Sequence, residues 1–233
     1  MNGASRTGGA LAIAAHPDDE VLGCGGVLAL HALAGDPVTV LVACEGEPGR
    51  RGPGGAYENA HLHQAAARLG VGDVRHLRLR DQALDTLRLA ELAGPLEAVV
   101  REVRPRVVYC QHGGDVNRDH HLLFQAALVA TRPTEPCIAE VYAFETASST
   151  EWGYPRSFVP DTWVDISRTL AAKLEAMACY RSELRDYPHP RSLRALENRA
   201  RALGNQVCLD AAEVFMTVRR VSRGGRAGPD GAS

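Results

Sequence analysis

The chain has 233 residues, of which 45% are hydrophobic and 23% are charged, which suffices for one large domain with a packed core. Its 26 lysines and arginines nearly balance 28 aspartates and glutamates, and the net charge of -2 argues against a basic surface for nucleic acid or an anionic membrane. The sequence has no apolar run long enough to cross a bilayer and no secretory signal, and its six cysteines form no CxxC pair, so we expect a cytoplasmic protein with reduced thiols.

Short apolar runs alternate with helical patterns through the first part of the chain. Strands are predicted at 11–15, 37–43, 74–79, 106–110 and 138–144, and helices between them at 20–34, 57–69, 86–103 and 121–130. Alternation of this kind predicts right-handed crossovers. We therefore expect an α/β fold in which helices flank both faces of a Rossmann-like, mostly parallel sheet.

The pattern changes after residue 145, where loop residues dominate as far as residue 161. Further elements are predicted as a strand at 163–166, helices at 170–180 and 191–206, and a last strand at 212–218. The sequence shows no repeat and no hinge-like linker. We therefore predict a single domain over 1–222, with a core at 10–145, a substrate-capping extension at 146–222 and a disordered tail at 223–233.

One histidine and three acidic residues follow the first predicted strand, in the sequence Ala15-His16-Pro17-Asp18-Asp19-Glu20. Ligands usually bind at the loops that leave the carboxyl ends of parallel strands. An imidazole and a carboxylate three residues apart can converge on one divalent cation, which leaves a second carboxylate free to act on a water molecule. A plainer interpretation is that Asp18 or Asp19 caps the following helix.

A second polar cluster follows the fourth predicted strand, in the sequence Gln111-His112-Gly113-Gly114-Asp115-Val116-Asn117-Arg118-Asp119-His120-His121. One imidazole from this loop would complete a set of two histidines, one carboxylate and an open position for water, as at a catalytic zinc. Asp119 would orient a ligating histidine through its second ring nitrogen. The plainer interpretation is a solvated loop that caps the helix predicted from residue 121.

These residues resemble the PIG-L/LmbE-like zinc-dependent de-N-acetylases, on the strength of the AHPDDE sequence and the later DxNxDH pattern. Looser matches are Gly25-Gly26, Arg80-Asp81, Tyr180-Arg181-Ser182-Glu183, His189-Pro190-Arg191-Ser192 and Ala212-Glu213-Val214-Phe215. The resemblance implies hydrolysis of the N-acetyl amide of an N-acetylglucosamine-type sugar or glycoconjugate. It also implies zinc or another divalent transition metal as cofactor, a small amino-sugar substrate, and a homo-oligomer, either trimer or hexamer.

The resemblance assigns roles to five residues around the metal. It implies that His16, Asp19 and His120 bind zinc and that Asp18 is the general base that activates water at the metal. Tyr180 would polarise the amide carbonyl or stabilise the oxyanion from the far side of the metal.

Further roles concern the leaving group and the substrate. His189 would be a cationic partner near the tetrahedral intermediate or the leaving amine, and Asp81, with Arg118 and Arg50, would bind the substrate. Many relatives carry a histidine where this chain has Asn117, so the general acid would be His189 or Asp18. An arginine often found at the start of the second helix is also missing, which leaves Arg50 or Arg51 as substitutes.

Three other functions are alternatives to this one. The first is an amidase that cleaves a larger acyl group or a cysteinyl conjugate. The second is a metal- or sugar-binding protein without turnover, although binding zinc would not require Asp18. The third is a nucleotide-binding module, but the chain lacks GxGxxG after the first strand, and close helix–sheet packing explains Gly23, Gly25 and Gly26 better than a phosphate loop does.

Overall fold

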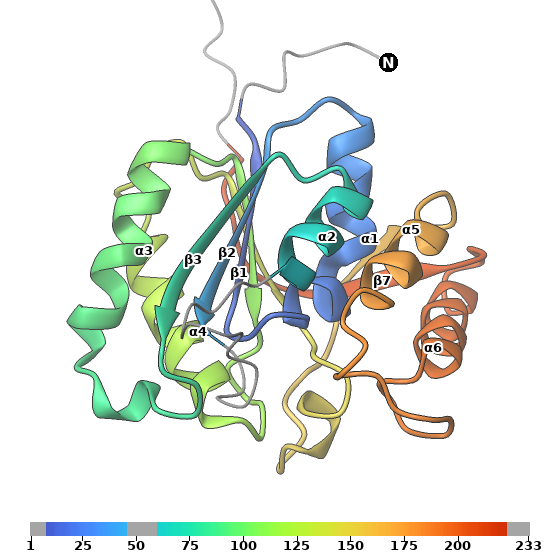
Figure 1. Cartoon of the computed structure of the whole chain (residues 1–233). Helices are drawn as coiled ribbons and strands as arrows, with labels where there is room; N and C mark the ends of the chain where they lie inside the picture. The colour runs from blue at the N-terminus through green and yellow to red at the C-terminus, as the bar shows by residue number, and fades with distance from the viewer. Residues whose placement is uncertain (1–7, 46–59, 223–233) are drawn as a thin grey trace, which may run out of the picture.

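A single seven-stranded sheet forms the centre of the protein in the computed structural model, which describes residues 8–45 and 60–222 (Figure 1). The strands are β1 (Ala10–Ala14), β2 (Val38–Cys44), β3 (Asp73–Leu79), β4 (Val107–Gln111), β5 (Glu140–Phe144), β6 (Thr162–Asp165) and β7 (Ala212–Arg220). Their order is β3-β2-β1-β4-β5-β7-β6. The first five strands pair in parallel, whereas β7 pairs antiparallel with both β5 and β6. The predicted mostly parallel sheet is confirmed. Both ends of each predicted strand lie within two residues of the ends of the observed strand.

Helices cover both faces of the sheet, as predicted. They are α1 (Asp19–Leu33), α2 (Ala60–Leu69), α3 (Leu89–Val103), α4 (Arg118–Ala130), α5 (Leu170–Met177) and α6 (Leu193–Asn205). Side chains of α1, α2, α5 and α6 share one apolar core, and those of α3 and α4 share the other. Successive residues of β1 contribute alternately to the two cores, and every residue of β1 and β2 is buried, as their uninterrupted apolar sequences require.

The predicted extension continues the same domain. Its strands β6 and β7 complete the sheet, and α5 packs against α1 and α2. Two short 3-10 helices, η2 (Leu84–Thr86) and η3 (Thr150–Trp152), lie in the connecting loops. Among residues 8–45 and 60–222, no helix combines the length and the apolar composition needed to cross a membrane. The predicted tail at 223–233 lies outside the described residues.

One helix boundary differs from the prediction in a way that matters for the site. Helix α4 begins at Arg118, not at residue 121, because the Asn117 side chain accepts a hydrogen bond of 2.9 Å from the Asp119 N–H and caps the helix. Asp119 and His120 therefore lie in the first turn of a helix and not in a loop. The fixed spacing of a helical turn sets the directions of their side chains.

Close packing of α1 against the sheet accounts for two of its glycines. A Cβ atom on Gly23 would lie 2.0 Å from the Phe144 ring, and one on Gly26 would lie 2.9 Å from Ile166. These separations are too short for any side chain, so the packing interpretation of these two glycines is confirmed.

Candidate metal centre

The loops that follow β1 and β4 meet at the middle of the sheet. These two strands are neighbours, but the chain passes from β1 to α1 on one face and from β4 to α4 on the other. Such a reversal leaves a crevice at the carboxyl ends of the two strands, where open α/β sheets bind ligands. His16 lies in the first loop and His120 in the first turn of α4.

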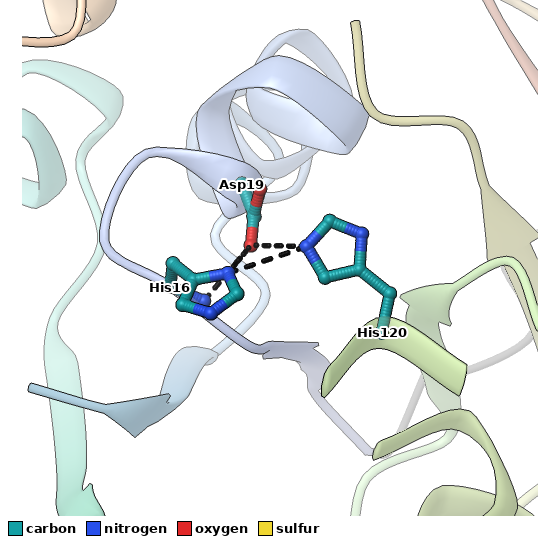
Figure 2. Close-up of side chains that lie close together, drawn as sticks. All are labelled: His16, Asp19 and His120. Atoms are coloured by element: carbon teal, nitrogen blue, oxygen red, sulfur yellow. Dashed lines mark hydrogen bonds and ion pairs between the residues drawn. The ribbon is translucent and has the colours of Figure 1, made fainter. Parts of the chain in front are cut away.

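Three side-chain atoms from these segments form a nearly equilateral triangle (Figure 2). His16 Nδ1 lies 3.2 Å from Asp19 Oδ2 and 3.2 Å from His120 Nε2, and His120 Nε2 lies 3.4 Å from Asp19 Oδ2. Ligands about 2.0–2.1 Å from a tetrahedral cation are about 3.3–3.4 Å from one another. The three residues predicted as metal ligands therefore come together at the spacing of one face of a tetrahedral site.

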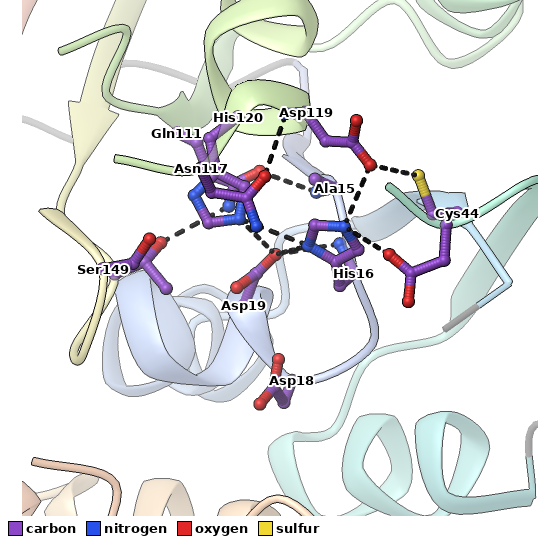
Figure 3. Close-up of polar contacts among 12 residues, drawn as sticks. Ala15, His16, Asp18, Asp19, Cys44, Gln111, Asn117, Asp119, His120 and Ser149 are labelled. Carbon is purple, nitrogen blue, oxygen red and sulfur yellow. Dashed lines mark hydrogen bonds and ion pairs between the residues drawn. The ribbon is translucent and has the colours of Figure 1, made fainter. Parts of the chain in front are cut away.

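Carboxylates contact the remaining ring nitrogen of each histidine (Figure 3). His16 Nε2 lies 3.0 Å from Asp81 Oδ1 and 3.3 Å from Asp119 Oδ2, and His120 Nδ1 lies 3.2 Å from Asp115 Oδ2. Histidines that bind metals commonly have this arrangement, because the carboxylate fixes the tautomer and the direction of the ring. It leaves Nδ1 of His16 and Nε2 of His120 for a cation.

Asp115 is anchored by residues from two loops. It accepts hydrogen bonds from the hydroxyl groups of Ser149 and Thr150, the latter at 2.6 Å, and from the Asn117 N–H at 2.8 Å. Asp115 belongs to the DxNxDH pattern, but the sequence alone predicts no role for it. The motif spacing, with Asp115 five residues before His120, is the signal that would have suggested one.

The charges of this cluster favour a cation. Burial lowers the pKa of His120, but the carboxylates of Asp19 and Asp115 outweigh it and raise the pKa to about 9. The pKa of His16 is also raised, because hydrogen bonds to carboxylates, that of Asp119 foremost, outweigh burial. Asp19 Oδ1 is buried and has no hydrogen-bond partner among the described residues. A cation bound to Asp19 Oδ2 can replace the protons of the two imidazoles, and the unpartnered Oδ1 leaves the carboxylate with negative charge that no described donor neutralises, so the donor set fits a metal.

Asp18 occupies the N-cap position of α1 but does not act as a cap. Its side chain accepts no capping hydrogen bond, and its φ of 115° is a strained value for a residue other than glycine. Burial raises the pKa of the Asp18 carboxyl well above its usual range, although Arg191 opposes the shift. The capping interpretation of Asp18 is therefore wrong, and the structure leaves a buried carboxylate next to a candidate metal ligand.

Arg191 is the charged partner of Asp18, which sequence analysis missed. Arg191 Nη1 lies 3.2 Å from Asp18 Oδ2 and 3.3 Å from Glu183 Oε2, and its Nε donates to Ser148 Oγ at 2.7 Å. The sequence carried Arg191 only as a member of a loosely matching motif. The two contacts to carboxylates fix the guanidinium beside Asp18.

The two other residues predicted to be catalytic lie in the segment between α5 and α6. The buried Tyr180 hydroxyl donates to Glu20 Oε1 at 2.5 Å. His189 is half-buried, its Nδ1 accepts a hydrogen bond of 3.1 Å from the Arg191 N–H, and its ring meets Trp152 edge-on. His189 therefore belongs to the same segment that supplies the partner of Asp18.

The residues predicted to bind substrate lie in different surroundings. Asp81 contacts His16, as described above, and Arg118 is exposed at the first position of α4. Arg50 and its alternative Arg51 lie outside the described residues.

The chain is similar in sequence and in fold to several known proteins. Residues 11–131 match the profile of a family described as "PIG-L: GlcNAc-PI de-N-acetylase". The chain is 30% identical over 188 residues to the uncharacterized deacetylase YaiS of Escherichia coli K12, covering 78% of this chain and 95% of YaiS. It is 33% identical over 192 residues to a 1D-myo-inositol 2-acetamido-2-deoxy-alpha-D-glucopyranoside deacetylase of Streptomyces avermitilis. That match covers 69% of this chain and 62% of the relative. The solved structure of the conserved protein TT1542 from Thermus thermophilus superposes with a TM-score of 0.76 at 25% identity, over 97% of this chain and all of that one.

Proposed function

The chain belongs to the PIG-L family, and from this premise we propose that it is a metal-dependent hydrolase that removes acetyl from an N-acetylglucosamine-type sugar or glycoconjugate. The observation that carries the proposal is the triangle of His16, Asp19 and His120 with the buried Asp18 beside it. The Streptomyces avermitilis relative supports the substrate class, because its name specifies a 2-acetamido-2-deoxy-glucopyranoside.

We assign His16 Nδ1, Asp19 Oδ2 and His120 Nε2 to one divalent cation. Zinc is the first candidate, because two imidazoles and one carboxylate with an open fourth position are a ligand set of catalytic zinc, although another divalent transition metal would also fit. When bound, such a cation supplies Lewis acidity, which makes water more acidic and polarises a carbonyl.

Asp18 is the general base in this proposal, and it takes the proton of the attacking water. Its burial makes it a better proton acceptor than an exposed aspartate, and the contact with Arg191 holds it in place. Tyr180 is assigned to the carbonyl oxygen of the substrate. That role requires its hydroxyl to exchange Glu20 for the substrate.

The leaving amine needs a proton, and His189 is the preferred donor over Asp18. His189 Nδ1 accepts the Arg191 N–H in this structure, so to act as the acid the ring must release that N–H and take a proton on Nδ1; the cationic imidazolium then donates its Nε2 proton to the amine and returns to the neutral form. Asp81, Arg118 and Arg50 are the proposed contacts to the sugar, and residues 146–222 the proposed cap. Location in the cytoplasm and assembly as a homo-oligomer stay predictions from the sequence.

An acetate-release screen over N-acetylated sugars tests the proposed function. Zinc-loaded protein is incubated with N-acetylglucosamine, its disaccharide and its glycosides, with matched sugars carrying longer acyl groups or cysteinyl amides. We expect acetate from at least one N-acetyl sugar. Release only from the longer or cysteinyl amides would favour the amidase alternative, and release from none would contradict the proposal.

Replacing Asp115 by asparagine is expected to weaken metal binding by about 10- to 100-fold, the range found when carboxylates behind ligating histidines are replaced. The amide keeps the shape of Asp115 but removes the charge beside His120 Nδ1. Competition with a chromophoric chelator measures the dissociation constant. Asp161→Asn is the matched control, because Asp161 also accepts hydrogen bonds but receives them from the exposed residue Thr217 and contacts no proposed metal ligand. An unchanged constant for Asp115→Asn would contradict the assignment.

Metal binding is expected to release protons and to strengthen as pH rises. The pKa of His120 is raised to about 9 in the folded metal-free protein, so a proton must leave before the ring can bind a cation. This proton stabilises the metal-free fold fully below about pH 6.5, and the stabilisation is lost as pH rises through about 9. We expect affinity to rise about tenfold per pH unit for each proton released. Calorimetric titration at pH 7 in two buffers of different ionisation enthalpy counts the protons, and a count of zero would contradict the expectation.

A further inference from the structure

Helix α1, which carries Asp19, is interrupted shortly after its start. Cys24 has φ -142° and ψ 16°, outside the helical region, and this residue separates a short first turn from the rest of the helix. In a continuous helix the Gly26 N–H would donate to the Leu22 carbonyl, four residues earlier. A buried break of this kind leaves a donor and an acceptor that need other partners.

A buried ion pair supplies those partners. The two carboxylate oxygens of Glu213, on β7, accept the N–H groups of Gly26 and Val27, both at 2.8 Å. Lys173 Nζ, on α5, donates to the Leu22 carbonyl at 2.9 Å and to Glu213 Oε1 at 2.5 Å. The ion pair is thus inserted between the two backbone groups that would otherwise bond to each other.

The ion pair is a specific feature and not a chance surface contact. Lys173 is 5% exposed and Glu213 is 4% exposed, and Lys173 is the only lysine of the chain. Burying two charges is unfavourable unless their remaining hydrogen-bonding capacity is satisfied. Two apolar side chains in their place would often stabilise a core equally well or better. Apolar side chains would, however, leave Leu22 O and Gly26 N without partners. The charges are therefore explained by the interruption of the helix.

Further contacts from the same elements fix the two parts of the helix on either side of Cys24. Thr169 Oγ1, just before α5, donates to the Gly26 carbonyl after the break at 2.8 Å, and the Tyr180 hydroxyl, just after α5, donates to Glu20 in the first turn. A single helical turn is not stable by itself, because nucleating a helix is unfavourable. The direction of this turn therefore depends on contacts from α5, which covers the same face of the sheet as α1 (Figure 1), and from β7, a strand of the sheet itself.

We propose that Lys173 and Glu213 are positioning residues, which direct the first turn of α1 so that Asp19 Oδ2 reaches the triangle with His16 and His120. The inference rests on the proposed function in one respect, namely that the triangle binds a metal. It gives residues 146–222 a role at the metal centre in addition to the proposed capping of substrate.

The test is the dissociation constant for Zn²⁺ of three variants, with the absorption spectrum of the Co²⁺-loaded protein as a second reading of ligand geometry. Lys173→Met/Glu213→Gln removes both charges, so no unpaired charge is buried. Lys173→Arg keeps the positive charge beside Glu213 but changes the shape of the donor at the Leu22 carbonyl, and it decides the question if the double variant fails to fold. Leu96→Ala, in the core on the opposite face of the sheet, is the control for lost stability.

We expect the double variant to bind Zn²⁺ at least about tenfold more weakly than the wild type, which is the effect of removing other groups that orient metal ligands. Its Co²⁺ absorption spectrum should also differ from that of the wild type. Leu96→Ala should lower Tm but keep the constant within about twofold of the wild type. Variants of Lys173 and Glu213 that unfold at lower temperature yet keep wild-type affinity and spectrum would show a merely structural role and overturn the inference. Wild-type protein that binds no metal would instead overturn the proposed function.

Discussion

Asp18→Asn is expected to lower kcat for amide hydrolysis by about 10²- to 10⁴-fold while the metal content stays at the wild-type value. The substitution preserves size and burial but removes the only proton-accepting group of the side chain. Asp18 does not cap α1, and its carboxylate is separate from the triangle formed by His16, Asp19 and His120. Loss of Asp18 should therefore affect proton transfer and not metal binding.

The measurements are kcat and KM for acetate release and the metal content by elemental analysis, both on purified protein. Asp165→Asn is a matched control, because Asp165 is an exposed aspartate that accepts hydrogen bonds from Ser167 at the edge of the sheet. Activity of Asp18→Asn within tenfold of the wild type would show that another group is the base. Loss of the metal would show instead that Asp18 is a ligand.

Much of the candidate metal centre could be predicted from the sequence, because its proposed ligands lie next to strands that the sequence defines well. β1 and β4 are continuous apolar runs, and the alternation of strands and helices implies that their carboxyl ends lie at one edge. His16, Asp18 and Asp19 follow the first of these strands within five residues. For these three residues, the local sequence and the sheet topology are sufficient to predict where in the fold they lie.

The groups that support those ligands could not be predicted in the same way, because each contact joins distant parts of the chain. Arg191 reaches Asp18 across 173 residues, and Glu213 reaches Gly26 across 187. Which charged residue faces which depends on how β6, β7 and α5 pack onto α1, and periodicity does not encode this. The start of α4 differs from the predicted one for a local reason: the pattern places Asn117 in a polar loop, whereas its side chain caps the helix.

Removal of the metal is expected to abolish activity and to lower Tm. Without a cation, the imidazoles of His16 and His120 hold protons among carboxylates, so the site has no Lewis acid to activate water. A ligand present at about 1,000 times its dissociation constant stabilises the fold by about 4 kcal/mol. For a chain of this size, that corresponds to a rise in Tm of about 10 °C.

Dialysis against a chelator, followed by addition of Zn²⁺, Co²⁺ or Mn²⁺, separates these effects when activity and Tm are followed together. His120→Ala removes one ligand and should show neither the recovery of activity nor the rise in Tm. His61→Ala removes an exposed histidine on α2 and should behave as the wild type does. Full activity in chelator-treated protein would contradict the metal-dependent mechanism. A rise in Tm of normal size in His120→Ala would place the cation elsewhere, since the two imidazoles and Asp19 must bind it together for the triangle to be the metal centre.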